Sequence, residues 1–110
     1  MKPIVCQKSR DDLANVQVTT LKGENVKLEQ SSDFSFTGET CFNIKKKMLE
    51  LHNQLKAGEI AMTDTEVYLH VLSKVYGRKD DWFLKNMDLK SIGVLYGQVM
   101  ELINGDEKNE

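Results

Sequence analysis

The stretch SIGVLYGQVMELI, residues 91–103, decides the fold class because its apolar residues recur at the spacing of one helix face. It also contains two glycines, Gly93 and Gly97, one helical turn apart. Each glycine inside a helix costs roughly 1 kcal/mol of helix stability relative to alanine. The pattern therefore predicts a helix, and the two glycines must contribute something that offsets their cost.

A helical wheel places the glycines beside a broad apolar face. Tyr96 and Met100 lie on the shoulder of this face, and Gly93 and Gly97 fall just past them, so the non-polar arc covers more than half of the helix. Where side chains are absent, a second backbone can approach closely. The notch either packs against another helix of the same chain or stays partly open for a partner helix. The face itself consists of Ile92, Leu95, Val99, Leu102 and Ile103.

Two longer helices are expected before this one. The first covers about residues 40–57, with Gly58 as its stop; its apolar side consists of Cys41, Ile44, Met48, Leu51 and Leu55. The second begins at a capping box formed by Thr63 and Glu66 and stops at Gly77. Its broad apolar arc consists of Val67, Tyr68, Val71, Leu72, Val75 and Tyr76.

The link between the second helix and the last one is expected to be mostly irregular. Residues 82–84, Trp-Phe-Leu, suit one short helical turn that follows Asp80 and Asp81. Asp88 is the expected N-cap of the last helix, which runs to about Asn104.

Residues 16–36 have the alternation of β-strands. Apolar residues at 16 and 18 and at 26 and 28 flank the turn sequence KGEN at 22–25, which predicts a β-hairpin. Phe34 and Phe36 continue the alternation and suit a short third strand. We therefore predict an α+β fold, in which a small N-terminal hairpin of two or three strands precedes a mainly α-helical bundle of three helices. One domain covers residues 1–104, and residues 105–110 form a charged tail that is expected to be mobile.

Composition narrows the possible functions. The net charge of −2 argues against nucleic acid as the main partner, because binding to phosphates normally requires a basic surface. Residues 1–10 lack the apolar run of a signal peptide, and residues 92–103 are too few to span a bilayer. Two cysteines, Cys6 and Cys41, do not form a disulfide framework. These features favour a location in the cytoplasm.

Residues suited to catalysis or metal binding are sparse. His52 follows Cys41 by about three helical turns, roughly 16 Å, so the two cannot bind one metal ion or form a nucleophile–base pair within that helix. His70 is expected on the polar side of its helix, in solvent. Zinc-ligand spacing, a phosphate-binding glycine loop and a Gly-x-Ser-x-Gly elbow are all missing from the sequence. We therefore expect no enzymatic activity, no metal and no cofactor.

Lys45, Lys46 and Lys47 form the one basic run, but a helix distributes them around most of its circumference. A solvated helix surface is the favoured interpretation. Nucleic-acid binding remains a third hypothesis, behind two kinds of protein-binding function.

Four short segments follow one another between Val67 and Ile103: VLSKVYG at 71–77, DDWFL at 80–84, MD at 87–88 and IGVLYGQVMELI at 92–103. With these segments, the region resembles the C-terminal half of the bacteriophage tail assembly chaperones of long-tailed phages. In that family a helix ends in a glycine-containing turn, and a short acidic and apolar segment then leads to a Leu/Met-Asp step and a final amphipathic helix. The hairpin around LKGENVKL, residues 21–28, is similar to the small β element of several members.

The resemblance implies a non-enzymatic protein that binds the long helical tape-measure protein, keeps it soluble and helps recruit tail-tube subunits. The alternative is a small regulatory or adaptor protein that binds a helix of a host or phage protein. Both functions use the broad helical faces, and a homo-oligomer is compatible with either. The residues expected to contact a partner are Tyr68, Leu72, Tyr76, Gly93, Tyr96, Gly97 and Met100.

Overall fold

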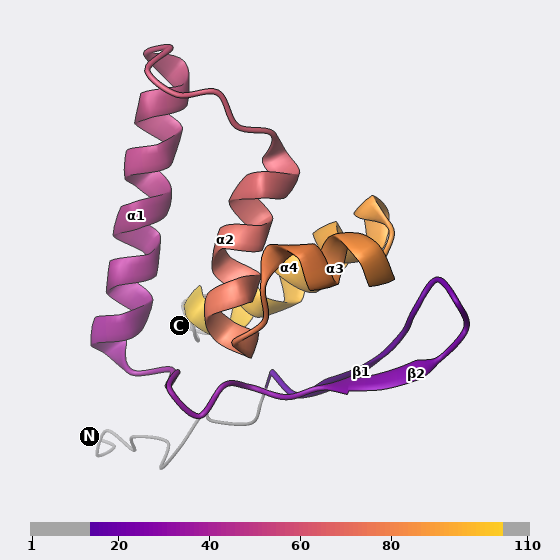
Figure 1. Ribbon diagram of the computed structural model, residues 1–110. Coiled ribbons are helices and arrows are strands. Elements are labelled where there is room, and N and C mark those ends of the chain that lie inside the picture. The colour runs from indigo at the N-terminus through magenta and orange to yellow at the C-terminus, as the bar shows by residue number, and fades with distance from the viewer. Residues whose placement is uncertain (1–13, 105–110) are drawn as a thin grey trace, which may run out of the picture.

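The computed structural model describes residues 14–104, which form a two-stranded hairpin followed by four helices (Figure 1). The expected α+β class, with an N-terminal hairpin and a mainly helical remainder, is confirmed. The expected number of helices is wrong by one, because the link before the last helix contains a helix of its own. The charged tail at 105–110 and the cysteine at position 6 lie outside the described residues.

The hairpin pairs strand β1 (Val16–Thr19) with strand β2 (Asn25–Leu28) in antiparallel fashion. Val16 lies opposite Leu28, and Val18 lies opposite Val26. The turn closes where the Thr20 N–H donates to the Glu24 carbonyl at 2.7 Å. Because Val16, Val18 and Leu28 share one face and pack on the core, the hairpin is stabilised by the helices, as a two-stranded sheet requires.

The expected third strand at Phe34 and Phe36 is wrong. The backbone turns there, with the Phe34 N–H donating to the Ser31 carbonyl and the Ser31 N–H donating to Val75 in helix α2. These bonds replace a sheet ladder. Both phenylalanine rings are buried, edge to face with their centroids 4.9 Å apart, so their alternation reflects burial beneath the helices.

Helix α1 (Gly38–Lys56) and helix α2 (Asp64–Tyr76) begin at side-chain caps. The Thr37 hydroxyl accepts from the Thr40 N–H, and Thr63 forms the predicted capping box with Glu66, with both of its hydrogen bonds present. Gly77 ends α2 with φ of +65°. A side chain at Gly77 would also meet Ser31, whose Cβ and Oγ lie 3.1 Å from an ideal Cβ position. Glycine is therefore required there for both conformation and space.

Helix α3 (Asp80–Asn86) replaces the single turn that the sequence predicts. Two aspartates occupy its first turn, and the Asn86 side chain donates to the Trp82 carbonyl at 2.8 Å. A helix of seven residues is marginal alone. Its stability comes from Phe83, which is fully buried in the core, and this tertiary anchor is not visible in the local sequence.

Helix α4 (Leu89–Asn104) begins where expected, with the Asp88 carboxylate accepting from the Ser91 N–H at 2.7 Å. This bond to the backbone lowers the pKa of Asp88. Four members of the predicted apolar face are buried, whereas the fifth, Leu102, is only half-buried. The buried residues are Ile92, Leu95, Val99 and Ile103.

Helix α2 is the centre of the molecule and contacts each of the other helices. Helix α1 runs beside it and α4 crosses behind it, and the hairpin begins near its C-terminal end (Figure 1). The Tyr76 hydroxyl donates to the Ala14 carbonyl at 2.7 Å, which ties the end of α2 to the segment that leads into β1. Burial raises the pKa of Tyr76 to about 12.

Candidate functional site

Five of the predicted contact residues form one strip along the α2–α4 junction. We call this strip the glycine flank; it consists of Tyr68 of α2 together with Gly93, Tyr96, Gly97 and Met100 of α4. The strip borders the core, because α2 and α4 pack directly on each other. Its position follows from helical spacing, which places these residues of α4 directly beside the buried face of that helix.

The other two predicted contact residues lie in the core. Leu72 is fully buried, and Tyr76 is 5% exposed. Both side chains point into the core because α2 is central and other elements pack around it. The sequence pattern alone was compatible with one side of α2 being exposed. Substitution of Leu72 would therefore change the stability of the fold, and neither side chain is available at the described surface.

Tyr68 and Tyr96 stack on each other across the junction. Their ring centroids lie 4.2 Å apart, and the planes are inclined by 22°. Both rings are half-buried. Burial raises the pKa of Tyr96, and the neighbouring Tyr68 raises it to a smaller extent. The pair thus forms an apolar aromatic surface beside the glycines, and tyrosines of this kind are common in protein interfaces.

The two glycines have different surroundings. At Gly93 an added Cβ would lie 3.7 Å from Tyr68 Cε2, an ordinary van der Waals contact, so this glycine faces α2. At Gly97 nothing lies within 4 Å of the same position, and the residue is exposed. The sequence left open whether the notch is internal or free. The structure divides it, with Gly93 inside the junction and Gly97 facing open space.

Leu89 extends the glycine flank, although the sequence reasoning missed it. Its side chain is 62% exposed at the first position of α4. Together with Gly93, Tyr96 and Met100 it has the spacing i, i+4, i+7, i+11, which places all four on one side of a helix. That periodicity was available in the sequence. The flank is therefore about three turns long, which is enough to hold a partner helix.

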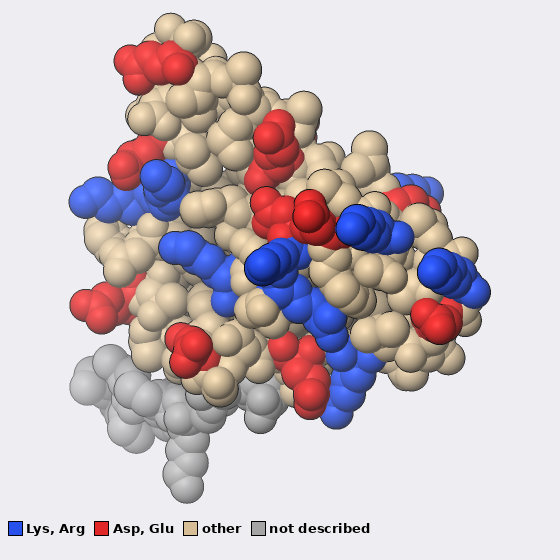
Figure 2. Space-filling model, viewed as in Figure 1, with Lys and Arg blue, Asp and Glu red and all other residues tan. Residues whose placement is uncertain are grey.

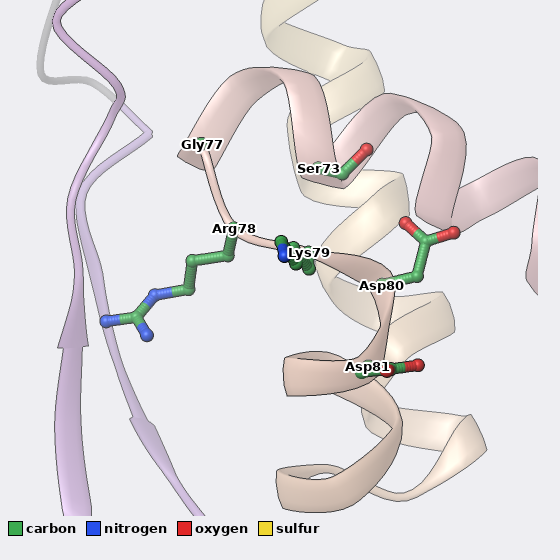
Figure 3. Close-up of a pocket in the computed structure, with 6 residues that line it drawn as sticks. All are labelled: Ser73, Gly77, Arg78, Lys79, Asp80 and Asp81. Carbon is green, nitrogen blue, oxygen red and sulfur yellow. The ribbon is translucent and has the colours of Figure 1, made fainter.

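A hollow of about 610 Å³ lies at the turn between α2 and α3, but its side chains diverge. In Figure 3 Arg78 extends toward the hairpin, whereas Asp80 and Asp81 lie on the other side of the turn. The Arg78 guanidinium lies 4.2 Å from the centroid of the Trp82 ring, so its role is to cover the half-buried tryptophan. Groups that do not converge on a common point make a poor binding site.

His70 differs from its expected solvated state. Its imidazole is half-buried on α2, and Nε2 is buried without a hydrogen-bond partner among the described residues. Burial lowers the pKa of His70, and the nearby cations of Lys74 and Lys47 lower it further. These effects all favour the neutral form of the imidazole. His52 is exposed and Cys41 is buried.

Charged groups of both signs share the surface. Lys45, Lys46 and Lys47 are exposed on α1, and Figure 2 shows acidic side chains interspersed among the basic ones on the viewed face. Two large apolar side chains of α1, Phe42 and Leu49, are also exposed. Within residues 14–104 no cluster of three metal-ligating side chains is present, and no helix there is long and apolar enough to cross a membrane.

Comparison of the chain with protein-family models, with curated proteins and with solved structures finds no match.

Proposed function

We propose that this protein is a non-enzymatic interaction module that holds a helix of a partner protein along the glycine flank. The observation that supports this most strongly is the open space at Gly97. Alanine would fit there and would stabilise α4, so the fold itself does not need glycine. A residue that weakens the helix without serving the fold points to a contact outside it, where a partner backbone approaches closely.

The side chains around Gly97 support the same function. The Tyr68–Tyr96 stack and the exposed Leu89 supply apolar area on one side of the glycine. Met100 adds a flexible side chain that adapts to different partner surfaces. An amphipathic helix lying in this strip would bury its apolar face against them, which is a common form of helix recognition.

The concrete form that we propose is a phage tail assembly chaperone acting in the host cytoplasm. Its partner would be the tape-measure protein, whose long apolar helix surface needs temporary cover, and tail-tube subunits would be recruited to the complex. The resemblance over residues 67–103 supports this proposal, and the glycine flank lies within that segment. A small adaptor that binds a helix of a different protein would use the same strip.

Co-expression tests the proposal. A tape-measure fragment from the same phage should stay soluble with the wild-type chain and with Gly97→Ala, and should precipitate with Gly97→Leu. The matched control is Gln98→Leu, which adds the same side chain at the next exposed position, about 100° around the helix. Circular dichroism of both leucine variants confirms that they are folded. If the fragment stays soluble with folded Gly97→Leu, the glycine flank is not the binding site.

If the fragment precipitates even with the wild-type chain, the chaperone assignment is wrong. Capture of a single non-structural protein through the same flank, lost in Gly97→Leu, would then identify an adaptor. The gene neighbourhood provides a separate check, because a tail chaperone gene is expected between a tail-tube gene and a very long tape-measure gene.

A further inference from the structure

We infer that the edge of β1 that faces away from β2 binds an extended, acidic peptide segment of a partner protein, which adds a third strand to the hairpin. This site lies on another side of α4 from the glycine flank and does not depend on the proposed chaperone function. The inference rests on the hydrogen-bond register of the hairpin, on the groove beside β1 and on the charge of that groove.

The register shows which backbone groups β1 leaves unused. Thr20 and Glu24 form the hydrogen-bonded pair that closes the hairpin. Bonded and non-bonded pairs alternate along an antiparallel ladder, so Val18 and Val16 bond to β2 and the residues between them do not. Gln17 and Thr19 therefore direct their N–H and C=O groups away from β2. Within residues 14–104 neither makes a backbone hydrogen bond outside the hairpin.

A groove of about 390 Å³ lies along this edge. All four consecutive residues of β1 line the groove. Successive side chains of a strand point to opposite faces, so a groove on one face would meet only every second residue. The groove therefore runs along the backbone edge of β1. Helix α4 forms the opposite wall, where the Val94 side chain is 55% exposed. The α4 side of the groove, with the residue before it, consists of Met87, Lys90, Ser91, Val94, Leu95 and Gln98.

The two edges of the hairpin are protected differently. Proteins commonly protect an exposed edge strand with lysine or proline. Strand β2 has Lys27 at an outward-facing position, whereas β1, with the sequence VQVT, has neither residue. An unprotected edge with unused donors and acceptors beside an apolar wall suits an extended peptide, whose backbone bonds to the edge while alternate side chains enter the groove.

Charge indicates the character of that peptide. Lys90 is the one charged residue among the described residues that line the groove, so a carboxylate on the incoming strand would be attracted to it. A second copy of this chain fits less well. Its own β1 carries no carboxylate, and pairing of two β1 edges about a two-fold axis would bring two Lys90 cations into one interface.

The test uses the full chain labelled with ¹⁵N and the capped heptapeptide Thr-Val-Glu-Val-Glu-Val-Thr as the probe. We expect saturable shifts of the Gln17 and Thr19 amide signals and slower hydrogen exchange of those two amides. The same peptide with lysine in place of glutamate should bind more weakly. Lys90→Glu should reverse the preference between the two peptides, because it reverses the charge of the groove.

Two proline variants separate the two edges. Gln17→Pro removes an N–H that faces the groove without breaking a bond to β2, and it should weaken binding by about tenfold. Lys27→Pro is the matched control, because its N–H also faces outward but on the β2 edge, and binding should stay unchanged. Signals of buried core residues show whether each variant is folded.

The inference is overturned if saturating peptide leaves the Gln17 and Thr19 amides unprotected, or if folded Gln17→Pro and Lys27→Pro weaken binding equally. It is also overturned if the two amides become protected without peptide as the protein concentration rises, because the edge would then pair with a second copy. Gly97→Leu should leave peptide binding unchanged, which distinguishes this site from the glycine flank.

Discussion

Replacement of Gly97 by alanine should stabilise the protein, and the size of the gain can be worked out from the structure. The residue is well inside α4, and nothing lies within 4 Å of an added Cβ. The full difference in helix propensity, about 1 kcal/mol, should therefore appear in the free energy of unfolding. For a chain of this size that corresponds to a rise in Tm of roughly 4–8 °C. Gly93→Ala should give a similar gain, because the new methyl would contact Tyr68 at 3.7 Å without a clash.

Urea denaturation followed by circular dichroism measures these changes, with Gly77→Ala as the contrasting variant. Gly77 has a positive φ and lies against Ser31, so alanine there should destabilise the protein by about 1 kcal/mol or more. The reasoning is refuted if Gly97→Ala lowers the free energy of unfolding, because the glycine would then be needed by the fold. If Gly97→Ala raises the free energy of unfolding as expected, the fold does not need this glycine. A contact outside the fold then remains as the reason for it.

Three further variants test the account of stability, each by denaturation. Tyr76→Phe should cost about 1 kcal/mol, because it leaves the buried Ala14 carbonyl without its hydrogen bond; an unchanged midpoint would contradict this. Thr63→Ala should cost roughly 1 kcal/mol through loss of the α2 cap, and equal stability would show that the cap is dispensable. The lowered pKa of His70 means that the unfolded chain binds a proton first. Stability should be full above about pH 6.5 and fall as the pH drops through the folded pKa. His70→Leu should remove this part of the pH dependence, and an unchanged pH profile in that variant would contradict the assignment.

Features set by neighbouring residues could be predicted from the sequence. The caps at Thr63 and Asp88 and the stop at Gly77 all appear where expected, because each depends on hydrogen bonds or dihedral angles within a few residues. The hairpin also forms around the predicted turn, although Asn25 already belongs to β2 and the turn closes between Thr20 and Glu24. Local chemistry therefore fixed the positions of the main elements before tertiary contacts were considered.

Features set by distant contacts could not be predicted in this way. Alternation at Phe34 and Phe36 looked like a strand, but contact with the end of α2 turns the backbone. Helix α3 depends on the burial of Phe83. Periodicity predicted the apolar arc of α2 but could not show that other elements cover the part of the arc around Leu72. Leu72 was therefore expected to contact a partner, whereas it is fully buried.

The candidate site was only partly predictable, for the same reason. The wheel of α4 placed the glycine flank correctly beside the core, because helical spacing alone determines which residues share a side. It could not show that Gly93 meets Tyr68 while Gly97 meets nothing. That difference depends on the crossing of α2 and α4, and it is the feature that converts a weak sequence signal into a site that can be tested.

The most direct measurement is the affinity of the purified protein for an amphipathic helical peptide from the tape-measure protein, measured by titration calorimetry with folded variants. The account expects Gly97→Leu to weaken binding by at least about tenfold, which corresponds to roughly 1.4 kcal/mol, and Gln98→Leu to leave it unchanged. Equal affinity of the wild-type protein and Gly97→Leu would contradict it.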